Sequence, residues 1–426
     1  MKILLEAPIL TRSGYGEHAR LVFKALSGLR NVEVLVSPLS WGQTSWISNY
    51  DSLRTEIERS ISAYRAYEDD HNKRSLKPFY DIQIHVGILN ELEKKSNVTY
   101  SVTAGIESDR VSAEWIVKTH QGVDKIIVPS NHSKTGFINT ICEIVNQKEG
   151  TTTKIGCASP IEVVPYPVKN ISPKDLDFSL DTKFNFLTVA LMGPRKNIEN
   201  TIKWFVKEFK DEDVGLVIKT GRARGSLIDK EFTLSYLKTL VSGQSPRKCK
   251  VYLLHGDLTE AEMASLYTRR DIHAYVTATH GEGYGLPIFE AAYAGLPVIA
   301  TNWSGHLDFL IDSDMNSGNK KSFAKVEYEL KEVSKDSVWK GIITKESRWA
   351  YPKELSFRKQ MRSVYGNHGM YKKWSKHLKE RLISSHSEEN VIKKMRKAIF
   401  GHQAPDLVLS EEEKNWNIKL SKIERL

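Results

Sequence analysis

The stretch HGEGYGLPIFEAAYAGLPVIATN, residues 280–302, carries the strongest fold signal in the chain. It follows the β-rich run IHAYVTAT at residues 272–279 and places three glycines ahead of Pro287. Proline suits the first turn of a helix, where its missing N–H costs nothing. Glycines before that turn let backbone amides approach an anion, which the positive end of the helix dipole attracts. The pattern therefore predicts a strand, turn and helix that bind a phosphate, and a diphosphate fits best.

Two carboxylates flank this turn, Glu282 before it and Glu290 eight positions later. A carboxylate at the end of the strand can face a reacting sugar. One inside the first turns of the helix can accept hydrogen bonds from a ribose diol. The alternative interpretation is a glycine-rich turn with an acidic residue near a helix start and no ligand, because single motifs of this kind are common.

The rest of the chain alternates β-rich and helical runs in two blocks. The first block opens with KILLEAP at residues 2–8, and the second opens with FNFLTVAL at residues 184–191. Such alternation predicts parallel sheets covered by helices on both faces. We therefore expect an α/β fold of two Rossmann-like, doubly wound domains that face each other across a cleft. The expected bounds are residues 1–170 for the first domain, 163–175 for a proline-rich linker, 176–385 for the second domain and 386–426 for a charged helical tail.

The composition is typical of a globular protein, with 40% hydrophobic and 27% charged residues. The net charge of +10 suits a polyanionic partner such as nucleic acid or an anionic membrane surface, or an enzyme of phosphorylated substrates. The three cysteines lack the CxxC spacing of a zinc or redox site. No apolar run is long enough to cross a membrane, and the amino terminus lacks the features of a signal peptide. We expect a cytoplasmic protein without a transmembrane segment.

The run from Glu282 to Glu290, continuing through Ile299, resembles the E-x7-E signature of retaining family-four glycosyltransferases with the GT-B fold. Similarity extends to FLTVALMGPRKNIENTIKWF at residues 186–205, and more weakly to GYGEHAR, DKIIVPSNHSKTGF and WAYPKELSFRKQMRSVY. The resemblance implies a nucleotide-sugar-dependent hexosyl- or pentosyltransferase that takes a UDP-sugar and requires no metal ion or other cofactor. The second domain would bind the donor, and the first would contribute most of the acceptor site.

The same resemblance assigns roles residue by residue. Glu290 would bind the nucleotide ribose, and Glu282 would face the transferred sugar. Arg195 and Lys196 would clamp the diphosphate. Further donor contacts would come from the second-domain turn, at Gly283, Tyr284, Gly285 and Leu286, of which Gly285 and Leu286 offer backbone amides. The first loop would contribute Gly14 and Gly16.

One position departs from the family pattern. Many members have an arginine five residues before the lysine of the R-K pair, but this chain has Leu191 there. Arg195 is the candidate substitute. Lys219, at a strand end and followed by Arg222 and Arg224, is a further candidate cation for the donor, although charges in such a loop can equally be solvated.

Two acidic residues follow a strand of the first block. Glu107 and Asp109 lie in GIESDR, beyond the strand that ends near Gly105. Open α/β sheets bind ligands at this edge, so both are candidate catalytic residues that contact the acceptor or the transferred sugar. For Asp109 a helix-capping role is an equal alternative.

Aromatic residues occupy a polar loop of the first block, SWGQTSWISNY, where they are Trp41, Trp46 and Tyr50. Exposed aromatic rings at a cleft can stack on sugars or bases. They can equally form a small satellite core.

Three alternatives remain for the acceptor and the activity. The segment LLEAPILTRSGYGEHARLVFKAL resembles glycosyltransferases of tailed bacteriophages. This resemblance implies that the acceptor is a hydroxymethylated pyrimidine in DNA and that the protein works in a bacterial host cell. The base would have to leave the duplex stack to enter the cleft. A saccharide or lipid headgroup in surface glycan assembly fits the family equally well. A sugar-nucleotide- or DNA-binding protein without catalysis is the alternative from another class.

Overall fold

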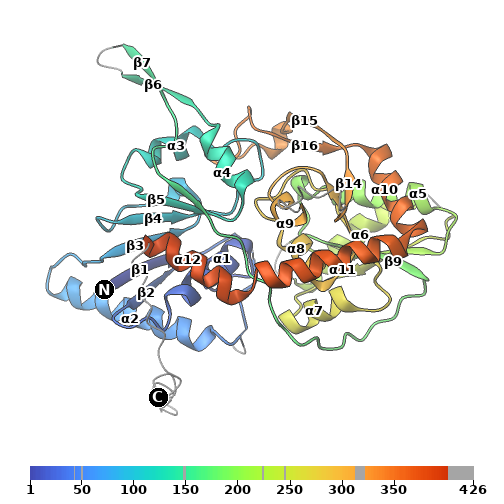
Figure 1. The fold of residues 1–426 in the computed structure, drawn as a ribbon, viewed down its shortest axis with the longest axis horizontal. Helices are drawn as coiled ribbons and strands as arrows, with labels where there is room; N and C mark the ends of the chain where they lie inside the picture. The colour runs from blue at the N-terminus through green and yellow to red at the C-terminus, as the bar shows by residue number, and fades with distance from the viewer. Residues whose placement is uncertain are drawn as a thin grey trace.

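The computed structural model describes residues 1–42, 44–48, 51–146, 150–222, 225–243, 246–311 and 322–401. In these residues the chain forms two Rossmann-like domains side by side, each built on a six-stranded parallel sheet (Figure 1). The α/β architecture predicted from the sequence is therefore confirmed. Tyr50, Arg224 and the end of the predicted helical tail from residue 402 lie outside the described residues.

The first sheet has the strand order β2-β1-β3-β4-β5-β8, and every neighbouring pair is parallel. Helices cover both faces of this sheet, so the middle of β1 is apolar, and its residues Ile3, Leu4 and Leu5 are fully buried. The strands are β1 Lys2–Ala7, β2 Glu33–Pro38, β3 Ile82–Val86, β4 Thr99–Val102, β5 Lys125–Val128 and β8 Ile161–Val163, with a separate hairpin of β6 Cys142–Asn146 and β7 Thr151–Ile155. The helices are α1 Gly14–Leu26, α2 Arg54–Lys73, η1 Leu89–Glu91, α3 Ala113–Thr119 and α4 Asn131–Ile138.

The second sheet has the order β11-β10-β9-β12-β13-β14 and is again parallel between all neighbours. Its strands are β9 Phe184–Val189, β10 Val214–Lys219, β11 Lys250–Leu254, β12 Ala274–Val276, β13 Val298–Thr301 and β14 Ala324–Val326, followed by an antiparallel pair, β15 Tyr328–Glu332 and β16 Arg348–Pro352. The helices are η2 Pro194–Lys196, α5 Ile198–Phe209, α6 Leu227–Ser242, α7 Glu260–Thr268, α8 Leu286–Ala294, α9 Leu307–Leu310, η3 Lys335–Ser337, α10 Glu354–Gly366 and α11 His368–Ser385.

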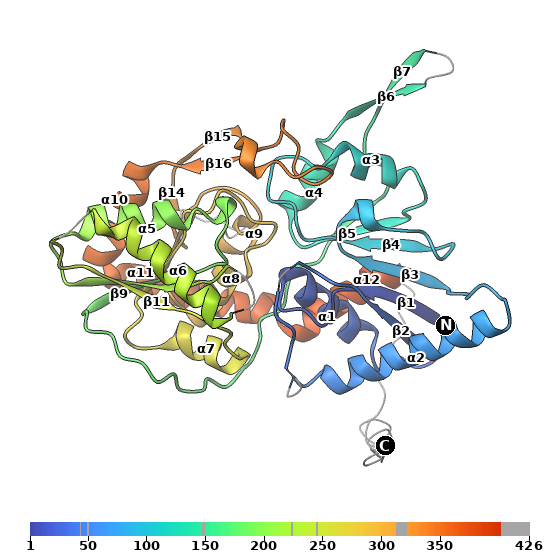
Figure 2. The same ribbon diagram turned by 180° about the vertical axis from the view of Figure 1, so that it is seen from behind.

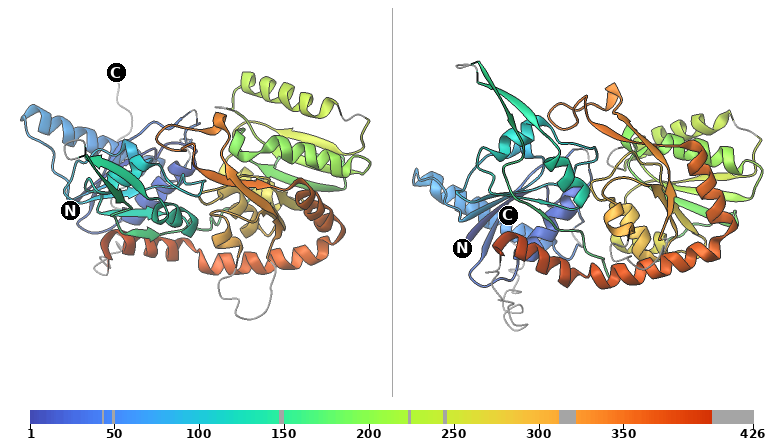
Figure 3. Two further views of the ribbon diagram at one scale, coloured as in Figure 1. Left: turned by 90° about the horizontal axis from the view of Figure 1, so that it is seen from above. Right: turned by 45° about the horizontal axis from the view of Figure 1, so that its top comes forward.

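The last described helix, α12 at Glu388–Phe400, returns to the first domain. Its residues Val391, Met395 and Ile399 are buried in that domain's hydrophobic core. In Figure 3, α11 and α12 run along the edge of the molecule from the second domain to the first. The described part of the expected tail is therefore a packed helix of the first domain.

The chain crosses between the domains at two places that lie together. The segment after β8 leads out of the first domain, and the junction of α11 and α12 leads back. The amide of Val168 donates a 2.7 Å hydrogen bond to the carbonyl of His386, which joins the two crossings.

A third link between the domains comes from the β15–β16 pair, which extends from the second domain toward α3 and α4 (Figure 2). The indole N–H of Trp115 donates to the carbonyl of Gly341, at 2.9 Å, in the segment between these strands. The guanidinium of Arg348 in β16 contacts the carboxylate of Asp109, also at 2.9 Å.

Candidate active site

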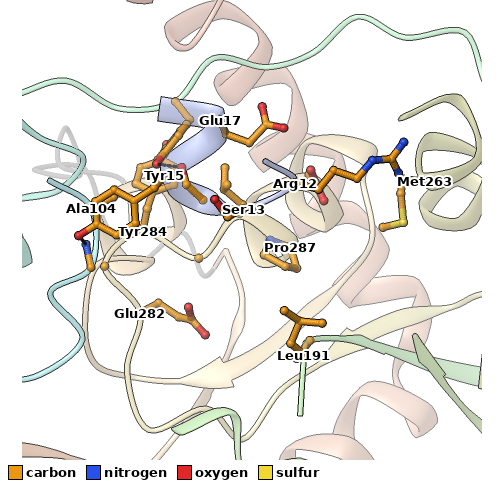
Figure 4. Close-up of a pocket in the computed structure, with 18 of the residues that line it drawn as sticks. Arg12, Ser13, Tyr15, Glu17, Ala104, Leu191, Met263, Glu282, Tyr284 and Pro287 are labelled. Carbon is orange, nitrogen blue, oxygen red and sulfur yellow. Dashed lines mark hydrogen bonds between the residues drawn. The ribbon is translucent and has the colours of Figure 1, made fainter. Parts of the chain in front are cut away.

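A cavity of about 1350 Å³ lies between the domains. Its walls come from the segments that follow β1, β3 and β4 in the first domain and β9 and β12 in the second. In Figure 4, Ser13 and Tyr15 of the first domain lie across the open space from Glu282 and Leu191 of the second. Both parallel sheets thus direct the carboxyl ends of their strands into one cavity, the usual ligand position in open α/β folds.

The turn predicted to bind phosphate leads directly into α8. Gly285 has a φ of 92° and precedes the helix, so this position favours glycine. Helix α8 begins at Leu286, with Pro287 in its first turn. The amide-bearing start of α8 faces the cavity, as Gly285, Leu286 and Pro287 all line it.

The two other glycines of this turn have a different structural role from the one we predicted. A Cβ at Gly283 would lie 1.9 Å from the carbonyl oxygen of Ala104, and one at Gly281 would lie 2.2 Å from that of Glu107. The carbonyl of Gly283 also accepts a 2.5 Å hydrogen bond from the Ser130 hydroxyl. These glycines let the backbones of the two domains touch, in addition to any contact with a ligand.

Glu282 lies buried in a cluster of cations. Its carboxylate accepts hydrogen bonds from Lys196 at 2.6 and 2.8 Å and from Arg195 at 3.0 Å. Thr279 donates a further hydroxyl bond of 2.9 Å. Burial alone would raise the pKa of the Glu282 carboxyl, but the nearby Lys196 and Arg195 lower it to about 2. Glu282 is therefore ionised at neutral pH and holds both cations in place.

Arg195 connects the two domains at the cavity wall. One of its guanidinium nitrogens lies 3.0 Å from the Glu282 carboxylate and the other lies 3.1 Å from the Glu107 carboxylate. Both glutamates line the cavity. The structure thus brings together Glu282, Arg195, Lys196 and Glu107, four residues that the sequence separates by as many as 175 positions.

Glu290 lies on α8, near the charged residues Lys169, Glu17 and Glu260. The Tyr267 hydroxyl donates to its carboxylate at 3.0 Å. Burial raises the pKa of the Glu290 carboxyl to about 7, against the smaller opposing effects of Lys169 and of the Tyr267 hydrogen bond. Glu290 lines the cavity and exchanges its proton near neutral pH.

Three predicted site residues lie elsewhere. Asp109 neither lines this cavity nor caps a helix: it accepts the backbone N–H of Arg348 at 2.7 Å and pairs with its guanidinium, while Ser112 caps α3. Lys219 is turned to the carbonyl of Gly256, to which its ammonium donates at 2.6 Å. Gly16 is enclosed by the carbonyl of Thr11, which a Cβ would approach to 2.1 Å.

The other predicted donor contacts do line the cavity, namely Gly14, Gly283 and Tyr284. Leu191 also lines it, with its side chain 57% exposed, at the position where an arginine was expected from the resemblance. Arg12 lies on the opposite wall, anchored to the carbonyl of Leu258 at 2.7 Å. Positive charge on the cavity wall comes from Arg195, Lys196 and Arg12, together with Arg20, Lys169 and Lys379.

Two supporting residues were missed from the sequence. Thr279 contacts Glu282 as described above, and the Ser304 hydroxyl accepts the backbone N–H of Glu282 at 2.9 Å. Thr279 stands three residues before Glu282, so a hydroxyl at the strand end was a usable signal. Ser304 lies 22 residues away, and nothing local in the sequence marks it.

The aromatic residues of the first-domain loop separate in the structure. Trp41 lines the cavity and packs against Tyr15, with ring centroids 4.3 Å apart. Trp46 is 60% exposed and is not part of the cavity wall.

Within the described ranges, no three His, Cys, Asp or Glu side chains are grouped so that they could hold a metal ion. Among the described helices, none combines the length and apolar character needed to cross a membrane.

Comparison with known proteins finds a family match within the second domain. Residues 175–327 match the family model described as Glycosyl transferases group 1. A probable sucrose-phosphate synthase of Thermosipho melanesiensis is 29% identical over 140 residues, which are 32% of this chain and 31% of that protein. The serotype-specific mannosyltransferase WbdA of Escherichia coli is 32% identical over 118 residues, which are 27% of this chain and 13% of that protein. The matches thus span less than a third of either relative.

The fold similarity extends over nearly the whole chain. The Anabaena protein HepE, solved in complex with UDP and glucose, superposes with a TM-score of 0.59 at 12% identity, covering 94% of this chain and 99% of that one. Residues 175–327 therefore form a Glycosyl transferases group 1 domain, within a chain that has the two-domain GT-B fold.

Proposed function

We propose that the chain is a retaining glycosyltransferase that moves a sugar from a UDP-sugar to an acceptor hydroxyl. The observation that carries this proposal is the arrangement around α8. An ionised Glu282 holds two cations in the turn ahead of the amide-bearing helix start, Glu290 lies within the helix, and all four residues line the same cavity. The matched family domain supports the reaction class, and the fold shared with a UDP- and glucose-bound structure supports the donor.

In the proposed reaction, the bond between the anomeric carbon and the diphosphate oxygen breaks as the acceptor oxygen bonds to that carbon from the same face. The departing UDP takes the electron pair and gains negative charge, which Arg195 and Lys196 stabilise from fixed positions. The ionised Glu282 stabilises the positive charge that develops on the sugar. The acceptor's proton passes to the diphosphate oxygen. Because these two side chains supply the positive charge, we propose that no metal ion is required.

We propose a saccharide as the acceptor. The relative WbdA is named as a mannosyltransferase, and residues 175–327, which match the family model, include both signature glutamates. The three cysteines are all free, so we also propose that the protein works in the reducing cytoplasm.

A DNA acceptor is the second candidate, and the distribution of charge favours it. Residues 353–401 hold thirteen lysines and arginines but four acidic residues, so they contribute nine of the ten net positive charges. Exposed lysines that could contact phosphates lie on α11 and α12: Lys373, Lys376, Lys393, Lys394 and Lys397.

The test is a panel of donors and acceptors. The protein is incubated with UDP-glucose, UDP-galactose, UDP-N-acetylglucosamine and GDP-mannose, each with oligosaccharides, unmodified duplex DNA or duplex DNA containing hydroxymethylcytosine. We expect UDP release and a hexose mass increment on a saccharide, with the anomeric configuration of the donor kept in the product. An increment on the modified DNA alone would replace the saccharide acceptor. An inverted product would overturn retention, and tight UDP binding without turnover of any donor would make the chain a binding protein.

A further inference from the structure

The segment between β15 and β16, residues 333–347 and here called the Trp339 loop, belongs to the second domain in sequence but is fixed to the first. Gly341 at its tip accepts the Trp115 indole N–H, and its φ of 76° favours glycine. A Cβ there would also meet the Glu114 carboxylate at 2.9 Å. Ile342 packs against the hydrophobic core of the first domain. The loop therefore has a defined position on the first domain.

The base of the loop is fixed to the catalytic turn. The backbone N–H of Ala350 donates to the carbonyl of His280 at 2.9 Å, and the imidazole Nδ1 of His280 lies 2.7 Å from the carbonyl of Ala350. The rings of Trp349 and His280 are stacked, with centroids 5.1 Å apart and an interplanar angle of 11°. Because His280 stands two residues before Glu282, the loop keeps a constant position relative to the reacting centre.

Trp339 differs sharply from its neighbour Trp349. Its backbone is held by two hydrogen bonds with Ile343, of 2.8 and 2.9 Å. Trp339 nevertheless lines the cavity and is 60% exposed, whereas Trp349, which also lines the cavity, is only 2% exposed. A large aromatic ring on a rigid backbone provides contact area at low entropic cost, so its exposure inside a ligand cavity indicates a binding surface.

The other loop residues on the cavity wall give that surface its chemical character. They are Asp336, Ser337, Val338, Ile342 and Ile343. In residues 333–347, all of which the structure describes, Asp336 is the single charged side chain on the wall. A carboxylate and a hydroxyl beside an apolar ring match the hydroxyl groups and apolar face of a pyranose. The same carboxylate repels the phosphate backbone of a nucleic acid.

We infer that the Trp339 loop forms the acceptor subsite, with Trp339 stacking on a neutral pyranose ring and Asp336 accepting hydrogen bonds from its hydroxyls. This inference rests on the proposed function and refines it. We expected the acceptor to be bound mostly by the first domain, whereas this loop extends from the donor domain. The acceptor ring and the signature glutamates would then be positioned by one continuous part of the chain.

The test compares Trp339→Ala, Trp339→Phe and a matched control, Trp46→Ala. Trp46 is equally exposed at 60% but does not line the cavity. With UDP-glucose as donor, transfer to methyl α-D-glucopyranoside and methyl α-D-mannopyranoside is measured, together with UDP release in the absence of acceptor. Saturation-transfer NMR with the same two glycosides reports contact between the sugar and aromatic protons.

We expect Trp339→Ala to raise the acceptor KM about tenfold or more, in line with the usual worth of one aromatic stacking contact. The kcat and the acceptor-independent UDP release should stay within twofold of wild type. Trp339→Phe should recover most of the loss, and Trp46→Ala should behave as wild type. Equal KM values for Trp339→Ala and wild type, or an equal loss in Trp46→Ala, would overturn the inference.

Failure of the proposed function gives a different result. If wild type neither releases UDP from any donor of the panel nor modifies an acceptor, the proposed enzymatic function is wrong. The acceptor subsite, which rests on that function, is then wrong as well. If wild type releases UDP but transfers glucose only to DNA containing hydroxymethylcytosine, the glycosyltransferase stands and the pyranose subsite is overturned.

Discussion

The two glutamates of one short motif lie in opposite surroundings. Glu282 is held by Lys196 and Arg195, and its pKa is lowered to about 2. Glu290, eight residues along the chain, accepts a hydrogen bond from a tyrosine hydroxyl, and burial raises its pKa to about 7. The spacing of the motif places both carboxyl groups beside the same helix start, but the neighbours contributed by distant segments decide their charge. One is a permanent anion and the other a proton-exchanging group.

The largest effect should come from Glu282→Gln. The substitution removes the charge that positions Arg195 and Lys196 and that stabilises the reacting sugar. We expect kcat for transfer to fall about 100-fold or more, the usual consequence of losing a fixed electrostatic group. Steady-state kinetics with saturating UDP-glucose measures it.

The same substitution should also destabilise the fold, because the partly buried Lys196 loses its ionic partner and Arg195 keeps only Glu107; the expected cost is roughly 3 kcal/mol in the free energy of unfolding. A second variant, Glu282→Gln with Lys196→Met, separates the two effects. It should regain part of the stability and none of the activity. A Glu282→Gln enzyme within threefold of the wild-type kcat would show that this carboxylate has no role in the reaction.

A smaller effect should come from Glu290→Gln, and it should depend on pH. The ionised carboxylate accepts hydrogen bonds from ribose hydroxyls better than the neutral acid, so wild-type UDP affinity should rise as the pH increases through about 7. Glu290→Gln should weaken UDP binding by about tenfold at pH 8 and remove this pH dependence. Calorimetric titration with UDP between pH 5.5 and 8.5 measures both.

Stability gives an independent check on the comparison. The pKa of Glu290 is higher in the folded protein than in an unfolded chain, so its favourable contribution is present at acidic pH and is lost as the pH rises from about 4.5 to 7. Glu282 has the opposite sign: its contribution is present above about 4.5 and is lost as the pH falls toward 2. Two results together would contradict the difference in pKa between the two glutamates. The UDP affinity would not change with pH, and the stability difference between wild type and Glu290→Gln would be the same at every pH.

The smallest effect should come from Tyr267→Phe. The lost hydroxyl donates to the Glu290 carboxylate and lowers its pKa, so the pKa of Glu290 should rise further without it. The midpoint of the UDP affinity profile should move to higher pH by about one unit or less, the equivalent of one hydrogen bond. Tyr275→Phe is the matched control, because the Tyr275 hydroxyl donates to the carbonyl of Val189 instead. A midpoint that moves to lower pH would contradict the assigned role.

Local sequence was sufficient for the features that depend on local structure. The alternation of apolar runs predicted both parallel sheets, and the order of glycine, proline and acidic residues predicted the start of α8 to within one residue. Glu282 and Glu107 were selected from strand ends, and Arg195 and Lys196 from the family resemblance; the carboxyl edges of the two sheets bring all four together.

Contacts between the domains account for most of what local sequence did not predict. Asp109 follows a strand as Glu107 does, but the β15–β16 pair, 239 residues away, engages it. Gly283 is required by the carbonyl of Ala104 on the other domain. The spacing of residues within one segment cannot predict such contacts, because they depend on how the two domains pack against each other.

Because α12 packs in the first domain, that domain is built from two separate parts of the sequence. Residues 1–163 alone would lack the apolar side chains of Val391, Met395 and Ile399. Truncating the chain after α11 should therefore destabilise the first domain, although that domain lies at the other end of the sequence. Both covalent passages between the halves lie at the hydrogen bond that joins Val168 to His386. The two passages therefore join the halves at one place, while the β15–β16 pair links them at another through Trp115 and Asp109.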